Sequence, residues 1–126
     1  MFTSIVVGTD GSDTATQAVR QAIELARAVG ARIELVSAYE PGRREDVEAT
    51  LREAGAEVEA AGVPVTTYAR EGDPADAILD VAEERGADLV VVGNKGMTGA
   101  KRFLLGSVPN KVSHHAPCSV LIIRTT

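Results

Sequence analysis

The chain has 126 residues, of which 44% are hydrophobic, 3% aromatic and 25% charged, and a single domain spanning residues 1–126 is the natural expectation. Its formal net charge of −5, from 13 basic and 18 acidic residues, argues against general nucleic-acid binding. The lone Cys118 excludes an internal disulfide framework. No apolar run approaches the roughly 18 residues of a membrane span, and no secretory signal pattern opens the chain, so we expect a cytoplasmic protein.

Short aliphatic runs, typical of strands buried on both faces, alternate along the chain with segments of helical periodicity. The elements are predicted in the order strand 4–8, helix 13–29, strand 32–38, helix 44–61, strand 64–68, helix 74–86, strand 88–93, helix 107–115 and strand 119–124. Ser12 or Asp13 can cap the first helix, and Gly30 ends it. Pro74 suits the first position of the third helix.

Strict alternation of strand and helix predicts a three-layer α/β/α sandwich around a five-stranded parallel sheet with right-handed crossovers. We expect the strand order 3-2-1-4-5, which reverses between the first and fourth strands. Ligands of such sheets bind at the carboxyl ends of the strands that flank the reversal. Those ends carry Gly8-Thr9-Asp10 and Gly93-Asn94-Lys95-Gly96.

A glycine-rich loop follows the fourth predicted strand and leads through Gly106-Ser107 into the last helix. Glycines allow the backbone to approach a ligand closely, and unpaired N–H groups at a helix start attract anions. From Asn94 onward the chain has no acidic residue but has five basic ones, namely Lys95, Lys101, Arg102, Lys111 and Arg124. This segment therefore predicts an anion site. The motifs of P-loop enzymes and of dinucleotide-binding folds are both missing.

The pattern Gly93-x2-Gly96-x9-Gly106-Ser107 resembles the ATP-binding signature G-x2-G-x9-G-[S/T] of the universal stress protein family. The similarity extends over nearly the whole chain and includes the segments 5–12, 71–74, 87–93 and 115–118. The resemblance implies an adenine nucleotide α-hydrolase-like fold and a regulatory protein that binds ATP, with Mg²⁺ bridging the phosphates, and that acts as a nucleotide-dependent homodimeric switch in the stress response.

By this resemblance, Gly8, Thr9 and Asp10 line the adenine and ribose side, and the backbone of Ala38 meets the adenine edge. The residues bordering ribose and the first phosphates are Val92, Gly93 and Gly96. The outer phosphates are taken by the backbone N–H groups of Gly106, Ser107 and Val108 and by the Ser107 hydroxyl. Pro109 stands where family members often have a residue with an N–H, so one donor is missing.

Several alternatives remain open from the residues alone. Asp10 can be a ligand contact or a helix-start residue. The nucleotide can be ATP, AMP or cyclic AMP. Slow ATP hydrolysis or autophosphorylation is the enzymatic alternative, although no general base, Walker lysine or arginine finger is recognisable, and we assign no catalytic residue. The adjacent His114 and His115 suit a helix end better than a metal site, and we expect no protein metal site.

The last predicted strand, from Ser119 to Arg124, falls at an edge of the expected sheet. An apolar edge strand without proline, bulge or inward charge invites pairing with another strand. The family resemblance implies a homodimer through the same strand. We therefore expect the chain to pair with a second copy there, with an adenine nucleotide as its small-molecule partner and without nucleic acid or membrane.

Overall fold

The computed structural model describes residues 2–94 and 106–125, so Gly96 and most of the predicted loop lie outside the described residues. The elements are β1 (Ser4–Gly8), α1 (Asp13–Val29), β2 (Arg32–Tyr39), α2 (Arg44–Ala60), β3 (Val65–Glu71), α3 (Pro74–Glu84), β4 (Leu89–Gly93), α4 (Ser107–His115) and β5 (Ser119–Ile123). None of the helices in the described ranges is long and apolar enough to cross a membrane.

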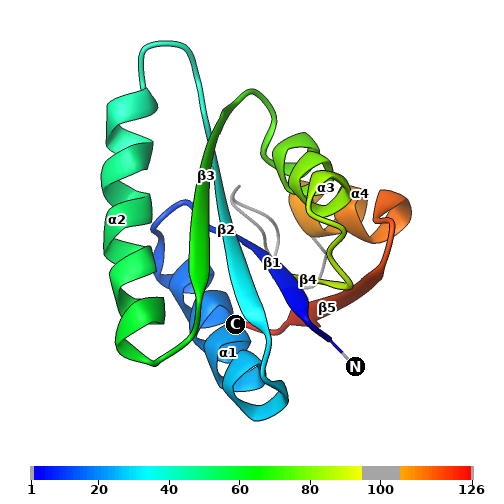
Figure 1. Cartoon of the computed structure of the whole chain (residues 1–126). Coiled ribbons are helices and arrows are strands. Elements are labelled where there is room, and N and C mark those ends of the chain that lie inside the picture. Colours follow the sequence, from blue (N-terminus) through cyan, green and yellow to red (C-terminus); the bar gives the residue numbers. More distant parts are fainter. Residues whose placement is uncertain (1, 95–105, 126) are drawn as a thin grey trace.

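The strands of the described chain form one five-stranded sheet in the order β3-β2-β1-β4-β5, and every adjacent pair is parallel. Helices α1 and α2 cover one face of the sheet, and α3 and α4 cover the other (Figure 1). The predicted sandwich and the predicted strand order are confirmed. Strands β1 and β4 lie side by side at its centre, as the position of the reversal requires.

The core is divided between the two faces by the pleat of the strands, since successive side chains of a strand point to opposite faces. In β1, Ile5 and Val7 pack with α1 and α2, whereas Val6 packs with α3 and α4. Alanines at the buried positions of α1 and α3 let these helices lie close to the sheet. This division explains why the core strands read as continuous aliphatic runs.

The ends of the helices follow from local chemistry. Ser12 caps α1, where its Oγ accepts the N–H of Ala15 at 3.3 Å, and Gly30 ends the helix in the left-handed conformation at φ 75°. Asp73 caps α3, where its Oδ2 accepts the N–H of Asp76 at 3.0 Å, and Pro74 follows as the first helical residue. These caps fix where α1 and α3 begin.

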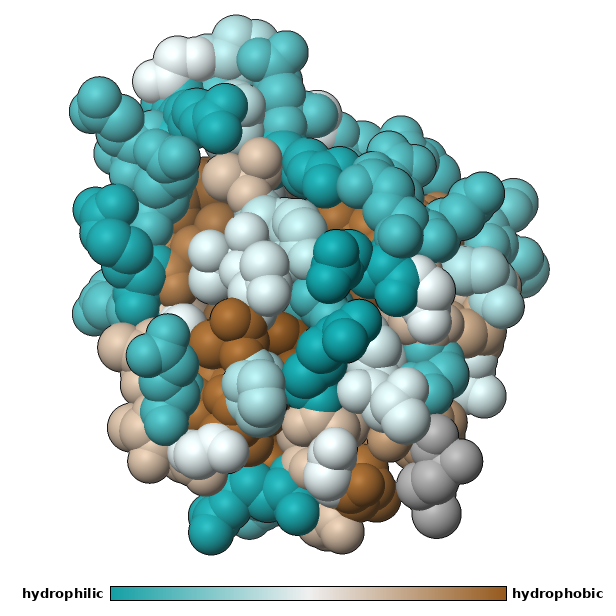
Figure 2. Space-filling model, in the orientation of Figure 1, coloured by the Kyte–Doolittle hydropathy of each residue, from teal (hydrophilic) through white to brown (hydrophobic). Residues whose placement is uncertain are grey.

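Strand β3 extends to Glu71, so the predicted end at residue 68 is wrong. Its pairing with β2 continues to Tyr39 and Glu71, and the N–H of Gly72 then donates to the carbonyl of Tyr39 at 3.0 Å. Because β3 is an edge strand, its outer positions carry polar residues and lack the aliphatic pattern of the inner strands. Figure 2 shows this face, with polar residues over α2 and apolar atoms visible between α2 and β3.

A buried carboxylate joins the strands on the α3 side of the sheet. Glu34 is 0% exposed, and its oxygens accept from the Ser4 hydroxyl at 3.2 Å, the Arg32 Nε at 2.6 Å and the Tyr68 hydroxyl at 2.9 Å. Arg85, which follows α3, approaches to 3.8 Å. Burial, followed by the bond to Glu34, raises the pKa of Tyr68. The carboxylate thus connects β1, β2, β3 and the end of α3.

Candidate functional site

The site is built at the carboxyl ends of β1 and β4, and the next helices along the chain, α1 and α4, lie on opposite faces of the sheet. After Gly8 the chain turns to α1, and the segment after Gly93 leads to α4 on the other face (Figure 1). Gly8 is buried and pairs with Val36, while Gly93 is half-buried and pairs with Ile123. The predicted residues of these two strand ends therefore lie close together, at the carboxyl ends of the central strands.

Hydrogen bonds to β2 hold the turn after β1 in place. The N–H of Thr9 donates to the carbonyl of Val36 at 2.9 Å, and the buried Ser37 hydroxyl donates to the carbonyl of Thr9 at 2.5 Å. The hydroxyl of Thr9 accepts the N–H of Gly11 at 3.1 Å, and Thr9 itself is 1% exposed. Thr9 therefore holds the turn in place, which leaves Asp10 as its exposed tip.

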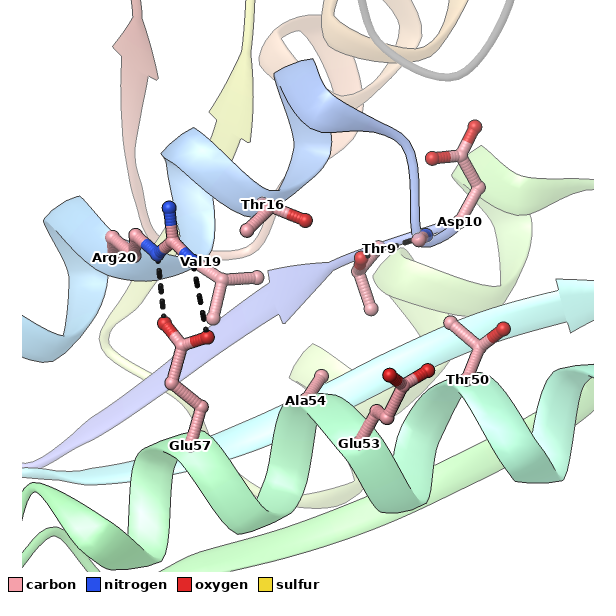
Figure 3. A pocket seen from close by; sticks show the side chains of 10 residues that line it. Thr9, Asp10, Thr16, Val19, Arg20, Thr50, Glu53, Ala54 and Glu57 are labelled. Carbon is pink, nitrogen blue, oxygen red and sulfur yellow. Dashed lines mark hydrogen bonds and ion pairs between the residues drawn. The ribbon is translucent and has the colours of Figure 1, made fainter.

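Asp10 uses one oxygen for the turn, where its Oδ1 accepts the N–H of Ser12 at 2.9 Å. No residue in the described ranges bonds its Oδ2. The side chain is exposed and points away from Thr50 and Glu53 of α2 (Figure 3). Ser12, and not Asp10, therefore caps α1, while Asp10 holds the turn that leads into the helix and keeps an acceptor for a ligand hydroxyl.

The predicted phosphate side is the start of α4. Gly106 is the residue before the helix, at φ −65° and ψ 168°, and no acidic residue occupies the first turn. Ser107 is exposed, whereas Val108 is 3% exposed and packs into the core on the α3 side, so its contribution to a ligand is limited to its backbone. An α-helix leaves its first N–H groups without intrahelical partners, so this end attracts negative charge.

Gly106 differs from the predicted picture in one respect. Its N–H donates to the carbonyl of Asn94 at 3.0 Å. In this structure that donor serves the backbone, although the resemblance implies that it binds phosphate. The bond joins residues 94 and 106, which flank the glycine-rich segment.

The remaining predicted contacts are backbone positions. Ala38 is half-buried against the cluster packed under α3 and α4, and Val92 is 2% exposed in the same cluster. A Cβ on Gly93 would lie 3.4 Å from the Thr125 side chain and 3.9 Å from the carbonyl of Thr14. Little room therefore remains above Gly93 for a larger residue.

Lys111, one of the five basic residues counted in the acid-free segment, is paired with two acidic residues at the start of α3. Its Nζ lies 2.8 Å from Asp76 and 3.5 Å from Asp73, and the hydrogen bond to Asp76 contributes most to raising its pKa. The acid-free composition of the last third of the chain does not reveal this, because the partners come from α3. Lys95, Lys101 and Arg102 lie outside the described residues.

A cleft that the sequence analysis did not predict lies between α1 and α2 (Figure 3). It has a volume of about 360 Å³, and the Arg20–Glu57 ion pair at 2.9 Å spans its walls. It is lined by Thr9, Asp10, Gly11, Thr16, Val19, Arg20, Thr50, Glu53, Ala54 and Glu57. Of these lining residues, Thr9 and Asp10 also belong to the predicted site.

Comparison with known proteins matches the family model described as "Universal stress protein family" to residues 1–124. The chain belongs to the universal stress protein family. A universal stress protein of Thermus aquaticus is 39% identical, over 98% of this chain and 100% of the relative. The universal stress protein Rv1636 of Mycobacterium tuberculosis is 37% identical, over 99% of this chain and 98% of the relative.

Among solved structures, a universal stress protein in complex with cAMP superposes with a TM-score of 0.86. It is 40% identical, and the match covers 99% of this chain and 98% of that one. The strand order and layers described above are therefore those of a universal stress protein fold. No sequence motif marks the cleft between α1 and α2. Among its lining residues, Gly11 has a φ of 81°, a conformation that favours glycine.

Proposed function

We propose that this chain binds an adenine nucleotide, with Mg²⁺-ATP as the leading ligand, between the turn after β1 and the start of α4. One observation supports this most. The Oδ2 of Asp10, which no described residue bonds, and the amino end of α4, which has no acidic residue in its first turn, lie on either side of the strand reversal, at the carboxyl ends of β1 and β4. The cAMP complex of a relative 40% identical to this chain supports the same ligand class.

In this proposal, Asp10 binds the ribose hydroxyls through Oδ2, and Gly8, Thr9 and the backbone of Ala38 border the adenine. Val92, Gly93 and Gly96 border the ribose and first phosphate. The N–H groups of Ser107 and Val108 face the outer phosphates, and Mg²⁺ bridges the phosphates. Gly106 contributes by shaping the helix start, since its N–H already donates to Asn94.

Cyclic AMP is the second candidate ligand, and the relative solved with cAMP favours it. Its single ring phosphate carries one negative charge and needs few of the N–H donors at the start of α4. ATP carries more charge and gains more from the amino end of α4. The two ligands therefore differ in how strongly they use that helix end, which makes them separable by competition.

Equilibrium titration of the full chain tests the proposal. We expect binding of ATP with Mg²⁺ that is tighter than binding of AMP and that GTP does not compete away, because the adenine edge is read by backbone. No detectable binding at millimolar Mg²⁺-ATP contradicts the ATP proposal. Tighter binding of cAMP than of ATP makes cAMP the ligand.

We also propose that the chain forms a homodimer through β5 in the cytoplasm, and that nucleotide binding alters this assembly. Strand β5 is at the end of the sheet order, and Leu121 on it is 39% exposed. Such an edge presents unpaired backbone groups to a second strand.

The substitution Leu121→Arg tests the dimer. Introducing a charge into an edge–edge contact disfavours pairing, so we expect the variant to sediment as a monomer at concentrations where the wild type is dimeric. Its thermal midpoint should change little beyond the loss of association. Thr66→Arg, on the exposed opposite edge strand β3, is the matched control and should leave the dimer intact.

A further inference from the structure

Asn94 bonds to two separate parts of the chain, the end of β5 with the residues after it and the start of α4. Its N–H donates to the carbonyl of Ile123 at 2.8 Å, and its carbonyl accepts the N–H of Gly106 at 3.0 Å. Its side-chain Oδ1 accepts both the N–H of Thr125 at 2.9 Å and the Thr125 hydroxyl at 3.0 Å. Because the donors of Thr125 require an oxygen, the orientation of the Asn94 amide is fixed.

The two backbone bonds of Asn94 link β5 to the start of α4, since one joins Ile123 and the other joins Gly106. The backbone of Asn94 extends the pairing of β4 with β5 by one residue and then receives the residue that caps α4. The position of Gly106 is therefore tied to that of Asn94 by a direct hydrogen bond.

The other two bonds reach past the end of β5. Thr125 is half-buried, and its Cγ2 lies 3.4 Å from the place that a Cβ on Gly93 would occupy. The Asn94 side chain thus holds the residues that follow β5 against the end of β4. Strand β5 is the same edge that we propose for the homodimer.

We propose that Asn94 is a positioning residue that couples nucleotide binding at the start of α4 to the β5 edge through Thr125. The inference rests on the proposed nucleotide binding and the proposed homodimer, and it names the residue that links them. Coupling between two sites is reciprocal, so a nucleotide that changes the dimer affinity by some factor must have its own affinity changed by the same factor on dimerisation.

The experiment measures the dimer dissociation constant of the full chain with and without Mg²⁺-ATP, and the ATP affinity of each variant. Thr125→Val removes the hydroxyl donor with little change of shape, whereas Thr125→Ser keeps it. Asn94→Ala removes the acceptor itself. Ser113→Ala, which removes an exposed hydroxyl bond to the Asn110 carbonyl within α4, is the matched control.

For the wild type we expect ATP to shift the dimer dissociation constant by a factor of about 5 or more, within the usual range of coupling. Thr125→Val should lower that factor to about half of its wild-type value or less, as the loss of one hydrogen bond predicts, and Asn94→Ala should bring it close to one. Thr125→Ser and Ser113→Ala should keep the wild-type factor. This coupling factor is a readout that simple destabilisation does not move.

The outcomes separate the two proposals. If the wild type binds no nucleotide, both fall. If it binds ATP but stays monomeric at every concentration, or if its dimer dissociation constant is the same with and without ATP, the coupling is overturned and nucleotide binding stands. Coupling factors equal to that of the wild type in both Thr125→Val and Asn94→Ala overturn the role of Asn94 in the same way.

Discussion

Asp10 shows how one side chain can serve both the fold and a ligand. Its Oδ1 holds the N–H of Ser12, and an asparagine at this position keeps that oxygen while losing the charge. We expect Asp10→Asn to keep the thermal stability of the wild type but to weaken ATP binding by about tenfold, the size expected for a hydrogen bond to a charged group.

Asp10→Ala is the companion variant. It removes both oxygens, so we expect it to lose about 1 kcal/mol of stability together with the ATP affinity. Thermal unfolding and ATP titration on the three proteins give both quantities. ATP affinity of Asp10→Asn equal to that of the wild type would leave Asp10 with its turn role alone.

Gly11, the next residue, is constrained by α2. It has φ 81°, and a Cβ would lie 3.0 Å from Cγ2 of Thr50. Gly42 has φ 86°, and nothing lies within 4 Å of a Cβ built there, so its substitution measures the cost of the backbone conformation alone. We expect Gly42→Ala to cost about 1–2 kcal/mol through the left-handed backbone and Gly11→Ala to cost about 1 kcal/mol more through the added contact.

Urea unfolding measures this difference. The substitution Thr50→Ser removes the Cγ2 methyl but keeps the hydroxyl that donates to the Asp46 carbonyl. In that background, Gly11→Ala should cost no more than Gly42→Ala. An equal cost for the two alanine variants in the wild-type background contradicts the role of Thr50.

At the level of the elements, strand order and helix placement were predictable because the aliphatic strands are buried on both faces and because caps such as Ser12 and Gly30 have local signatures. The end of β3 was not predictable, since an edge strand needs apolar residues on fewer positions. The engagement of Lys111 by Asp76, and of the Gly106 N–H by Asn94, depends on contacts between elements distant in sequence. A composition pattern carries no information on such pairings.

The Glu34 carboxylate makes a testable connection between β2 and β3. Tyr68→Phe removes a donor from a buried charge, so we expect a loss of about 2 kcal/mol in the free energy of unfolding. Tyr39→Phe, which removes an exposed hydroxyl bonded to Arg44, should cost less than about 0.5 kcal/mol. In a Glu34→Ala background the effect of Tyr68→Phe should largely disappear, and a persistent loss there contradicts the interaction.

For the whole molecule, acid stability depends in part on Asp88, which precedes β4 and reaches back to β1. Burial opposes its charge, but the N–H groups of Ser4 and Thr3 and the Thr3 hydroxyl outweigh it, and the pKa of Asp88 is lowered. A carboxyl whose pKa is lowered by folding stabilises the native state above its unfolded pKa of about 3.9 and ceases to do so as the pH falls through the folded value.

Asp88→Asn therefore should be less stable than the wild type by a constant amount at neutral pH. The gap should narrow as the pH falls below about 4, because the wild type then loses by protonation the charge that the variant lacks at every pH. Urea unfolding of both proteins between neutral and acidic pH measures the gap. A gap that is the same at all pH values contradicts this contribution.

The central pairing of β1 with β4 also sets the order in which the molecule can form. The bond between Thr3 and Asp88 spans 85 residues, whereas β1, α1 and β2 follow one another directly. Contacts of such high sequence separation slow folding, since a long loop must close before they form. During synthesis, strands β1, β2 and β3 can assemble with α1 and α2 before β4 is available, and the side of β1 that pairs with β4 is then unpaired. Until β4 has been synthesised, that aliphatic edge of β1 is unpaired in the nascent chain, and its exposed backbone groups favour aggregation.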